Sequence, residues 1–128
     1  MTPTRVASPW GTTFSDSISF DGPGRWIFVS GQIGARLDKT LVNETFAAEA
    51  DQCFERIRLS LEKAGAKMGD VVKLLGFVTG IEHYPDYDAA RGRAFASNPP
   101  ASSTVAVAGL ALGARVEVEA IAFIPAGS

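Results

Sequence analysis

The first candidate for chemistry is a pair of glutamates in an alternating segment near the C-terminal end. A strand with the sequence RVEVEAIAFIP would have one face made of Arg115, Glu117, Glu119, Ile121 and Phe123. Glu119 lies where the polar half of that face meets its apolar half. Partial burial there would raise the pKa of the carboxyl group, which suits a general acid or base near neutral pH. Solvation, or an ion pair with Arg115, is the alternative interpretation, and Glu117 has the same ambiguity with less reason to be buried.

Few other side chains have reactive chemistry. The one cysteine, Cys53, falls on the apolar side of a helical pattern, which favours a buried core thiol over a nucleophile. The one histidine, His83, lies in a predicted loop before a helix. These two residues cannot supply the ligand cluster of a transition metal, so no metal site is predicted. A G-x-S-x-G motif is absent, and the glycines around 31–34 are too few for a dinucleotide or Walker loop.

Composition and charge exclude several classes of partner. The 128 residues include 12 Lys and Arg against 14 Asp and Glu, for a net charge of −2. This balance gives no general attraction to nucleic acid or to anionic membranes. The first residues lack the pattern of a secretory signal, and the apolar run 105–114 is about half the ~20 residues of a membrane span. We therefore expect a cytoplasmic protein that forms a single domain over residues 1–128.

The elements that must position these residues follow from periodicity and turn chemistry. Residues 17–30 are predicted to form two strands around the turn Asp21–Gly24, as in a hairpin. Residues 45–64 are predicted to form a helix, with Asn43 as its N-cap and Gly65 as its stop. The apolar stripe of this helix comprises Phe46, Ala50, Cys53, Phe54, Ile57, Leu61 and Ala64.

The second half of the chain predicts three more strands and one helix. The strands cover residues 70–79, 103–107 and 115–124, and the helix begins at Pro85 and reaches about Ala96. The order ββαβαββ indicates an α+β fold, a mixed sheet with both helices packed on one face. The other face of such a sheet needs cover, so self-association is expected.

Several segments together carry a resemblance to a known family. They are FVSGQI at 28–33, LEKAGAKMGDVVK at 61–73, FVT at 77–79, PASSTV at 100–105 and VEVEAIA at 116–122. Over nearly its whole length the chain resembles the RidA/YjgF family of reactive-intermediate deaminases. The resemblance implies a fold like that of the small trimeric chorismate mutases, and hence a homotrimer with three sites in the clefts between subunits.

The resemblance also implies an activity. Family members of the active type hydrolyse 2-imino acids, and the tautomeric 2-enamino acids, to 2-keto acids and ammonia. Water attacks the imine carbon, and neither a metal nor an organic cofactor takes part. The implied partner is a small-molecule substrate rather than nucleic acid or a membrane.

Individual residues take roles from the same resemblance. Glu119 matches the glutamate that positions or activates the water, and Gly31 matches a glycine whose backbone faces the substrate. Phe14 stands where the family often has a tyrosine, and Asp88 where it often has an asparagine. Thr104 matches a small pocket residue, so it joins the expected substrate-binding set.

The segment Pro100–Thr104 contains the main departure from the family. Ser102 stands where the family pattern Pro-Ala-Arg-Ser/Thr has an arginine that clamps the substrate carboxylate, and Ser103 follows it in the pocket. Losing such a charged partner typically costs roughly 2–5 kcal/mol, or about 30- to 4,000-fold in affinity or rate. With Phe14 also replacing a tyrosine, the expected pocket is less cationic and more apolar than the family's.

Three arginines elsewhere in the chain could supply the missing charge. They are Arg25, Arg91 and Arg115. Their sequence positions do not say which of them reaches the pocket, so all three remain candidates for the anchor of a substrate carboxylate.

Three hypotheses about function follow. The first is a hydrolase that retains the water-activating Glu119 but acts on less anionic or larger imines and enamines. The second is a ligand-binding trimer of the same fold without catalysis. The third, RNA cleavage, is ranked last because it normally needs a basic surface and a general acid/base pair.

Overall fold

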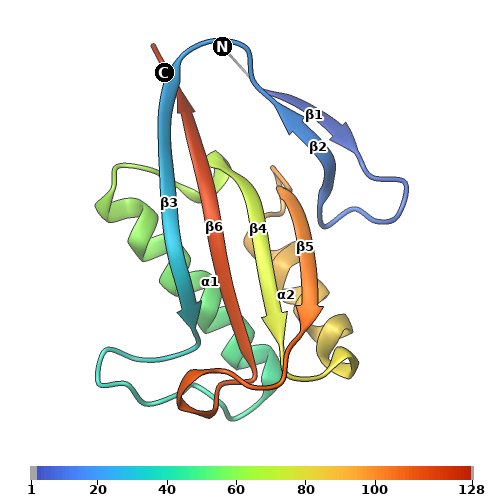
Figure 1. The fold of residues 1–128 in the computed structure, drawn as a ribbon, viewed down its shortest axis with the longest axis vertical. Coiled ribbons are helices and arrows are strands. Elements are labelled where there is room, and N and C mark those ends of the chain that lie inside the picture. The colour runs from blue at the N-terminus through green and yellow to red at the C-terminus, as the bar shows by residue number, and fades with distance from the viewer. Residues whose placement is uncertain (1–2, 128) are drawn as a thin grey trace.

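The structure, a computed structural model, describes residues 3–127 as a six-stranded mixed sheet with two α-helices on one face (Figure 1). The strands are β1 (Thr4–Ala7), β2 (Ser15–Ser19), β3 (Gly24–Ile33), β4 (Val71–Val78), β5 (Ala101–Ala106) and β6 (Val116–Pro125). The helices are α1 (Phe46–Lys63) and α2 (Tyr84–Ala94). The predicted α+β class is thus confirmed, with β1 as an additional short strand. None of the helices in residues 3–127 combines the length and apolar composition needed to cross a bilayer.

The strand order differs from the predicted hairpin. The sheet runs β1-β2-β5-β4-β6-β3, so β2 and β3 lie far apart in it although they are consecutive in the chain. β2 pairs with β1 antiparallel and with β5 in parallel, whereas β3 pairs along its length with β6. The hairpin prediction is therefore wrong, and the segment around Asp21–Gly24 is a crossing between the two ends of the sheet (Figure 1). Local turn chemistry indicates where a chain bends but does not choose the partners of the flanking strands.

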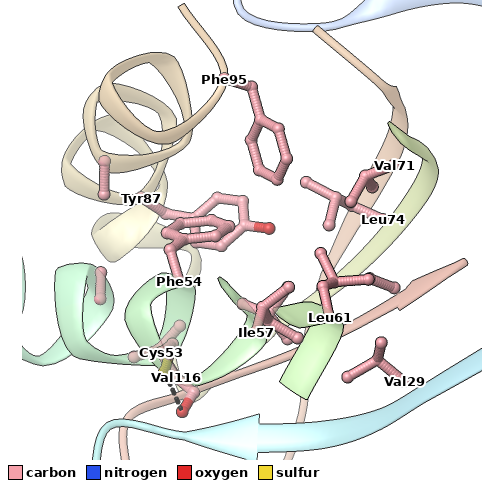
Figure 2. Close-up of a cluster of buried hydrophobic side chains, with 14 of the residues drawn as sticks. Val29, Cys53, Phe54, Ile57, Leu61, Val71, Leu74, Tyr87, Phe95 and Val116 are labelled. Atoms are coloured by element: carbon pink, nitrogen blue, oxygen red, sulfur yellow. Dashed lines mark hydrogen bonds between the residues drawn. The ribbon is translucent and has the colours of Figure 1, made fainter. Parts of the chain in front are cut away.

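One face of the sheet and the apolar stripe of α1 make the core. The stripe residues Ala50, Cys53, Ile57 and Leu61 are fully buried, as their spacing predicts. Figure 2 shows Ile57 and Leu61 directed from α1 toward Leu74 of β4, all belonging to one buried cluster.

The ends of α1 are set by a side-chain cap and a glycine. Thr45, rather than the predicted Asn43, is the N-cap, because its hydroxyl accepts a hydrogen bond from the Ala48 N–H at 3.0 Å. At the other end Gly65 has φ +81°, a conformation that glycine adopts without strain, which confirms it as the stop. The second helix is shifted from the predicted 85–96, beginning at Tyr84 with Pro85 in its first turn.

Alternation along β6 separates a covered from an uncovered side of the sheet. Val116, Val118, Ala120 and Ala122 are buried under the helices. The intervening side chains, among them Glu117 and Glu119, project to the opposite side, which we call the open face. The predicted division of this strand into two faces is confirmed.

A buried ion pair holds the beginning of β6 against α1. The Glu49 side chain is fully buried, and its two oxygens accept hydrogen bonds from the Arg115 backbone N–H at 2.7 Å and Nε at 2.8 Å. Its neighbour Gly34 lies directly against Glu49, where a Cβ atom would collide with the Glu49 backbone and side chain. The pair of Glu49 and Arg115 therefore holds the residue before β6 at a fixed position on α1.

Replacing Glu49 with Gln should destabilise the fold by about 2–3 kcal/mol, because an amide NH₂ would replace an oxygen that accepts from Arg115. Urea unfolding at fixed protein concentration measures the loss. The control is Glu44→Gln, which breaks an exposed pair with Arg36 (3.5 Å) and should cost less than about 0.5 kcal/mol. Equal effects of the two substitutions would contradict the role assigned to Glu49.

Cys53 should be inert toward thiol reagents in the native state. Burial raises the pKa of its thiol, and the carboxylates of Glu49 and Glu117 raise it further. The thiol lies 3.6 Å from the Val116 carbonyl oxygen (Figure 2). Since the thiolate is the reactive form, we expect little reaction with Ellman's reagent at pH 8 and rapid reaction after unfolding in guanidinium. A fast, complete reaction of the folded protein would show that the thiol is accessible.

Candidate functional site

A buried arginine on α2 lies at the centre of most of the predicted pocket residues. The side chain of Arg91 is only 2% exposed, and it projects from α2 toward β5 and the segment before β2. We call the residues around it the Arg91 cluster: Thr13, Phe14, Tyr84, Asp88, Arg91, Ser102 and Thr104.

The guanidinium reaches the hydroxyl of Ser102. Arg91 Nη1 donates to Ser102 Oγ at 2.9 Å and lies 3.5 Å from Thr104 Oγ1. Ser102 and Thr104 alternate with Ser103 along β5, so both project to the helix-covered side of the sheet. The structure therefore places an arginine fork beside Ser102 although the chain has no arginine on β5 itself.

The second nitrogen of the fork is held by a carboxylate and two hydroxyls. Arg91 Nη2 donates to Asp88 Oδ1 at 2.7 Å, one helical turn away on α2. It also donates to Tyr84 OH at 3.0 Å and to Thr13 Oγ1 at 3.1 Å. Thr13 in turn donates to the same Asp88 oxygen at 2.6 Å. The positive charge is thus paired within the chain.

Aromatic rings surround the guanidinium. Its central carbon lies 5.0 Å from the Phe14 ring centroid, 5.3 Å from that of Tyr87 and 5.7 Å from that of Tyr84. At these distances the rings attract the cation, which offsets part of the cost of burying its charge. Arg91 Nε has no hydrogen-bond partner among the described residues. The predicted pocket residue Phe14 therefore packs on the cation.

A second group of predicted residues lies on the open face. The carboxylate of Glu117 packs directly on Gly31 of β3, where any Cβ atom would collide with it. β3 changes register between Val29 and Gln32, so Gly31 lies at an irregularity of the strand. The group that closely approaches the Gly31 backbone in the single chain is therefore the Glu117 carboxylate.

Glu119 lies further along the open face. It pairs in register with Leu75, which pairs on its other side with Ser103, so the three residues form one row across β6, β4 and β5. Glu119 is exposed, so the partial burial expected for it is not present in the single chain. The ion pair with Arg115 considered as an alternative is also absent from the described contacts, since Arg115 pairs with Glu49.

The predicted site residues thus form two groups on opposite sides of one sheet. Phe14, Asp88, Ser102 and Thr104 meet at Arg91, whereas the open face carries Gly31, Ser103 and Glu119. Side chains on opposite sides of a sheet cannot both touch one small molecule within the same chain.

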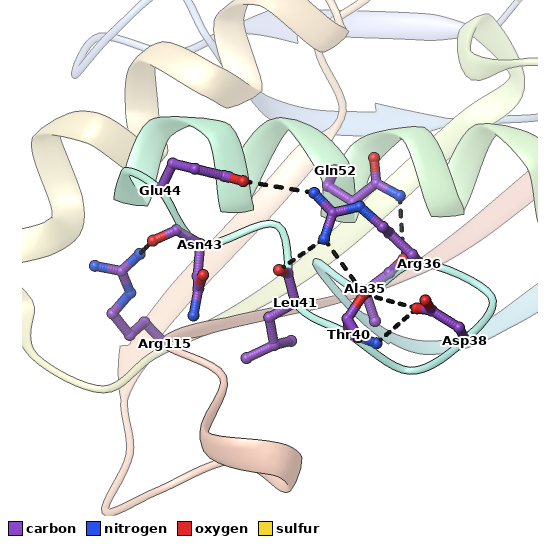
Figure 3. A network of polar contacts seen from close by, with 9 residues as sticks. All are labelled: Ala35, Arg36, Asp38, Thr40, Leu41, Asn43, Glu44, Gln52 and Arg115. Atoms are coloured by element: carbon purple, nitrogen blue, oxygen red, sulfur yellow. Dashed lines mark hydrogen bonds and ion pairs between the residues drawn. The ribbon is translucent and has the colours of Figure 1, made fainter.

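Of the three candidate arginines, only Arg91 reaches the predicted pocket. Arg25 donates to the Ala64 carbonyl oxygen at 2.8 Å. Arg115 is held by Glu49 and by the Asn43 carbonyl oxygen at 3.2 Å, as Figure 3 shows for Asn43. In the same view Arg36 ties the loop before α1 to Glu44 and to the Leu41 carbonyl oxygen.

Four residues of the two groups were not assigned from the sequence. Thr13 and Tyr84 received no role, Glu117 was considered only as the candidate with less reason to be buried than Glu119, and Arg91 was one of three open candidates. The spacing of Asp88, Arg91 and Tyr84 was a usable signal, because residues three or four positions apart share one helix face. The other reactive side chains lie elsewhere: His83, for example, stacks on Phe46 with ring centroids 4.4 Å apart. Within residues 3–127 no group of three or more His, Cys, Asp or Glu side chains is arranged to hold a metal ion.

Comparison with solved structures finds proteins of the same fold. Structures with the same fold include a protein of the conserved Rid family, YyfB from Yersinia pestis, with a TM-score of 0.80 and 27% identity, covering 88% of this chain and 87% of that one. RidA from the Antarctic bacterium Psychrobacter has a TM-score of 0.73 and 30% identity, covering 94% of each chain.

Sequence comparison also finds proteins similar to this chain. A 2-iminobutanoate/2-iminopropanoate deaminase from Dermatophagoides farinae is 38% identical over 102 residues, 79% of this chain and 80% of that protein. Protein HMF1 from Saccharomyces cerevisiae is 38% identical over 96 residues, 75% of this chain and 74% of that protein. The model of the family described as Endoribonuclease L-PSP matches residues 8–124. This chain therefore belongs to the Endoribonuclease L-PSP, or RidA/YjgF, family.

Proposed function

We propose that this protein is a cofactor-independent hydrolase that deaminates an imine or enamine metabolite. Relatives with 34–38% identity carry the name 2-iminobutanoate/2-iminopropanoate deaminase, which supports this reaction class. The observation that carries the proposal is the carboxylate of Glu117 packed against Gly31 on the open face. A carboxylate beside exposed backbone N–H and C=O groups can orient a water molecule and a polar substrate together.

The reaction needs one base that later serves as an acid. The imine reacts in its protonated form: the carboxylate accepts a proton from water as the water oxygen bonds to the imine carbon, which gives a neutral carbinolamine. The carboxyl group then returns that proton to the nitrogen. As the C–N bond breaks, the carboxylate takes up the hydroxyl proton, and the products are a carbonyl compound and ammonia, which finally receives this proton. Each step moves one proton over a short distance, which one glutamate can do.

Two glutamates are candidates for this base. Glu119 is the residue predicted from the sequence, and it remains a candidate because it shares the open face with Glu117. Glu117 is half-buried and contacts Gly31, whereas Glu119 is exposed. Because Glu117 contacts Gly31 and Glu119 does not, we assign water activation to Glu117.

We further propose that the active form is the homotrimer, with sites between subunits. In one chain the Arg91 cluster and the pair of Gly31 and Glu117 lie on opposite sides of the sheet, so a neighbouring copy must bring one to the other. The open face also exposes large apolar side chains, including Phe28 at 73% and Trp26 at 55%, which favours its burial against another copy.

Binding without catalysis is the second candidate function. It is favoured by one observation: Arg91 is already paired with Asp88, and only the hydroxyl of Ser102 stands where the family has its charged clamp. A pocket of this kind could retain affinity for a metabolite without the charged contact that orients the metabolite for attack by water.

Turnover of freshly generated 2-iminopropanoate and 2-iminobutanoate distinguishes these possibilities. We expect carbonyl release that falls roughly 100-fold or more in Glu117→Gln, since general acid–base catalysis contributes about 10²–10⁴-fold. The matched variant Glu119→Gln should lose less than about tenfold. Both variants should keep the wild-type assembly and unfolding midpoint, because glutamine has the size and polarity of the glutamate that it replaces.

The reverse order of the two losses would return the role to Glu119. Turnover that neither substitution changes would exclude a glutamate-assisted mechanism, and binding with no turnover in the wild type would favour the non-catalytic function.

Light scattering after gel filtration tests the assembly. We expect about 40 kDa, three times the 13.5 kDa of one chain. Phe28→Asp should dissociate the trimer, because it places a charge in the middle of the apolar open face. Ile81→Asp, at another exposed apolar side chain, is the control and should leave the trimer intact. A monomeric wild type would contradict the intersubunit site.

A further inference from the structure

The Arg91 cluster holds a cation whose charge is neutralised from within. Arg91 and Asp88 form an ion pair of 2.7 Å, and Thr13 bridges the two groups by accepting from Arg91 and donating to Asp88. The Arg91 side chain is 2% exposed, whereas that of Asp88 is 40% exposed. A ligand at this surface therefore meets the carboxylate side of the pair and does not touch a bare guanidinium.

Two residues of the cluster that keep partial exposure, Ser102 and Tyr84, carry hydroxyls. Ser102 Oγ and Tyr84 OH each accept a hydrogen bond from Arg91, at 2.9 and 3.0 Å. Neither hydroxyl donates to an acceptor in the described part of the chain, and both residues are half-buried. A hydroxyl that accepts from a cation directs its own proton elsewhere and is polarised into a stronger donor. The cluster thus presents two donors and no net charge.

We propose that the Arg91 cluster binds an uncharged carbonyl-type oxygen of the substrate through Ser102 and Tyr84. This inference rests on the proposed function and specifies its preferred substrate class: amides or esters of imino acids bind more tightly than the free acids, which remain weaker substrates. Arg91 is a positioning residue in this scheme, because it orients and polarises the two hydroxyls without touching the ligand.

Charge decides between the two kinds of substrate. A free carboxylate at Ser102 would lose water and gain two hydroxyl donors, but it would also lie near the Asp88 carboxylate, which cancels the attraction of Arg91. An amide or ester carbonyl has a smaller desolvation cost and no repulsion from Asp88. The same two hydrogen bonds therefore bind the uncharged group more tightly.

Binding of two stable probes to the intact protein tests the proposal. Pyruvate and pyruvamide differ only in carrying a carboxylate or a carboxamide, and titration calorimetry or ligand-observed NMR gives both affinities. We expect the wild type to prefer pyruvamide. Ser102→Ala and Tyr84→Phe should each weaken pyruvamide binding by about 3- to 10-fold, the usual value of one neutral hydrogen bond.

Tyr87→Phe is the matched control. Tyr87 lies three residues from Tyr84 on the same helix, but its hydroxyl is fully buried and has no hydrogen-bond partner in the described residues. Burial raises the pKa of Tyr87 to about 12, and the ring that packs on Arg91 is retained in the variant. Its loss of pyruvamide affinity should be less than about twofold, which separates binding effects from disturbance of α2.

If the ion pair between Arg91 and Asp88 sets the preference for pyruvamide, Asp88→Asn should shift that preference toward pyruvate. Removing the negative charge leaves Arg91 uncompensated, so the ratio of pyruvate to pyruvamide affinity should rise about tenfold. The expected result is a relative gain in pyruvate affinity, which partial unfolding of the variant would not produce.

A wild-type preference for pyruvate, or a preference unchanged in Asp88→Asn, would overturn the proposal, as would no pyruvamide binding at millimolar concentrations. Failure of the proposed function would give a different set of results. If imine turnover is absent while pyruvamide binding depends on Ser102 and Tyr84, the binding inference stands and the deaminase assignment falls. If 2-imino acids are turned over without any effect of Asp88→Asn on their affinity, the reverse holds.

Discussion

Covering the sheet on one side only is the constraint on which the rest of the structure depends. α1 and α2 both pack on the side where Leu74, Val116 and Val118 project, and the alternation of β4 and β6 sends every second side chain to the open face. The same alternation splits the candidate site. Serine and threonine hydroxyls of β5 meet α2, while the carboxylates of β6 face outward, which is why the proposed site combines residues of two subunits.

The Arg91 cluster shows how a family pocket can change its charge without losing a cation. The guanidinium approaches Ser102 from α2 and is paired with Asp88 one turn earlier on the same helix, under the rings of Phe14 and Tyr84. A charge that is buried and paired organises the hydroxyls around it, whereas an unpaired fork would attract a carboxylate directly. Under the binding proposal above, an arginine on the helix instead of the strand changes which substrate group the site binds.

Most predictions that depend on local pattern held, apart from the N-cap at Asn43, whereas the hairpin, which depends on distant partners, did not. The stripe of α1, the stop at Gly65 and the two faces of β6 follow from periodicity and backbone conformation within a few residues. The hairpin failed because β2 and β3 each pair with strands more than eighty residues away, β5 and β6. Short β1 escaped prediction because four residues carry too little periodicity to separate a strand from a loop.

The sequence by itself determined the fold class and the buried side of each main element. Those properties are encoded in side-chain type and spacing, which the chain carries locally. The resemblance to a known family indicated Phe14, Asp88, Ser102 and Thr104, which lie together at Arg91. Only the tertiary structure decided that Arg91, and not Arg25 or Arg115, reaches Ser102, and that Glu117 rather than Glu119 packs on Gly31. Both outcomes depend on strand order and on a register change in β3, and such long-range geometry leaves no mark in the spacing of residues along the chain.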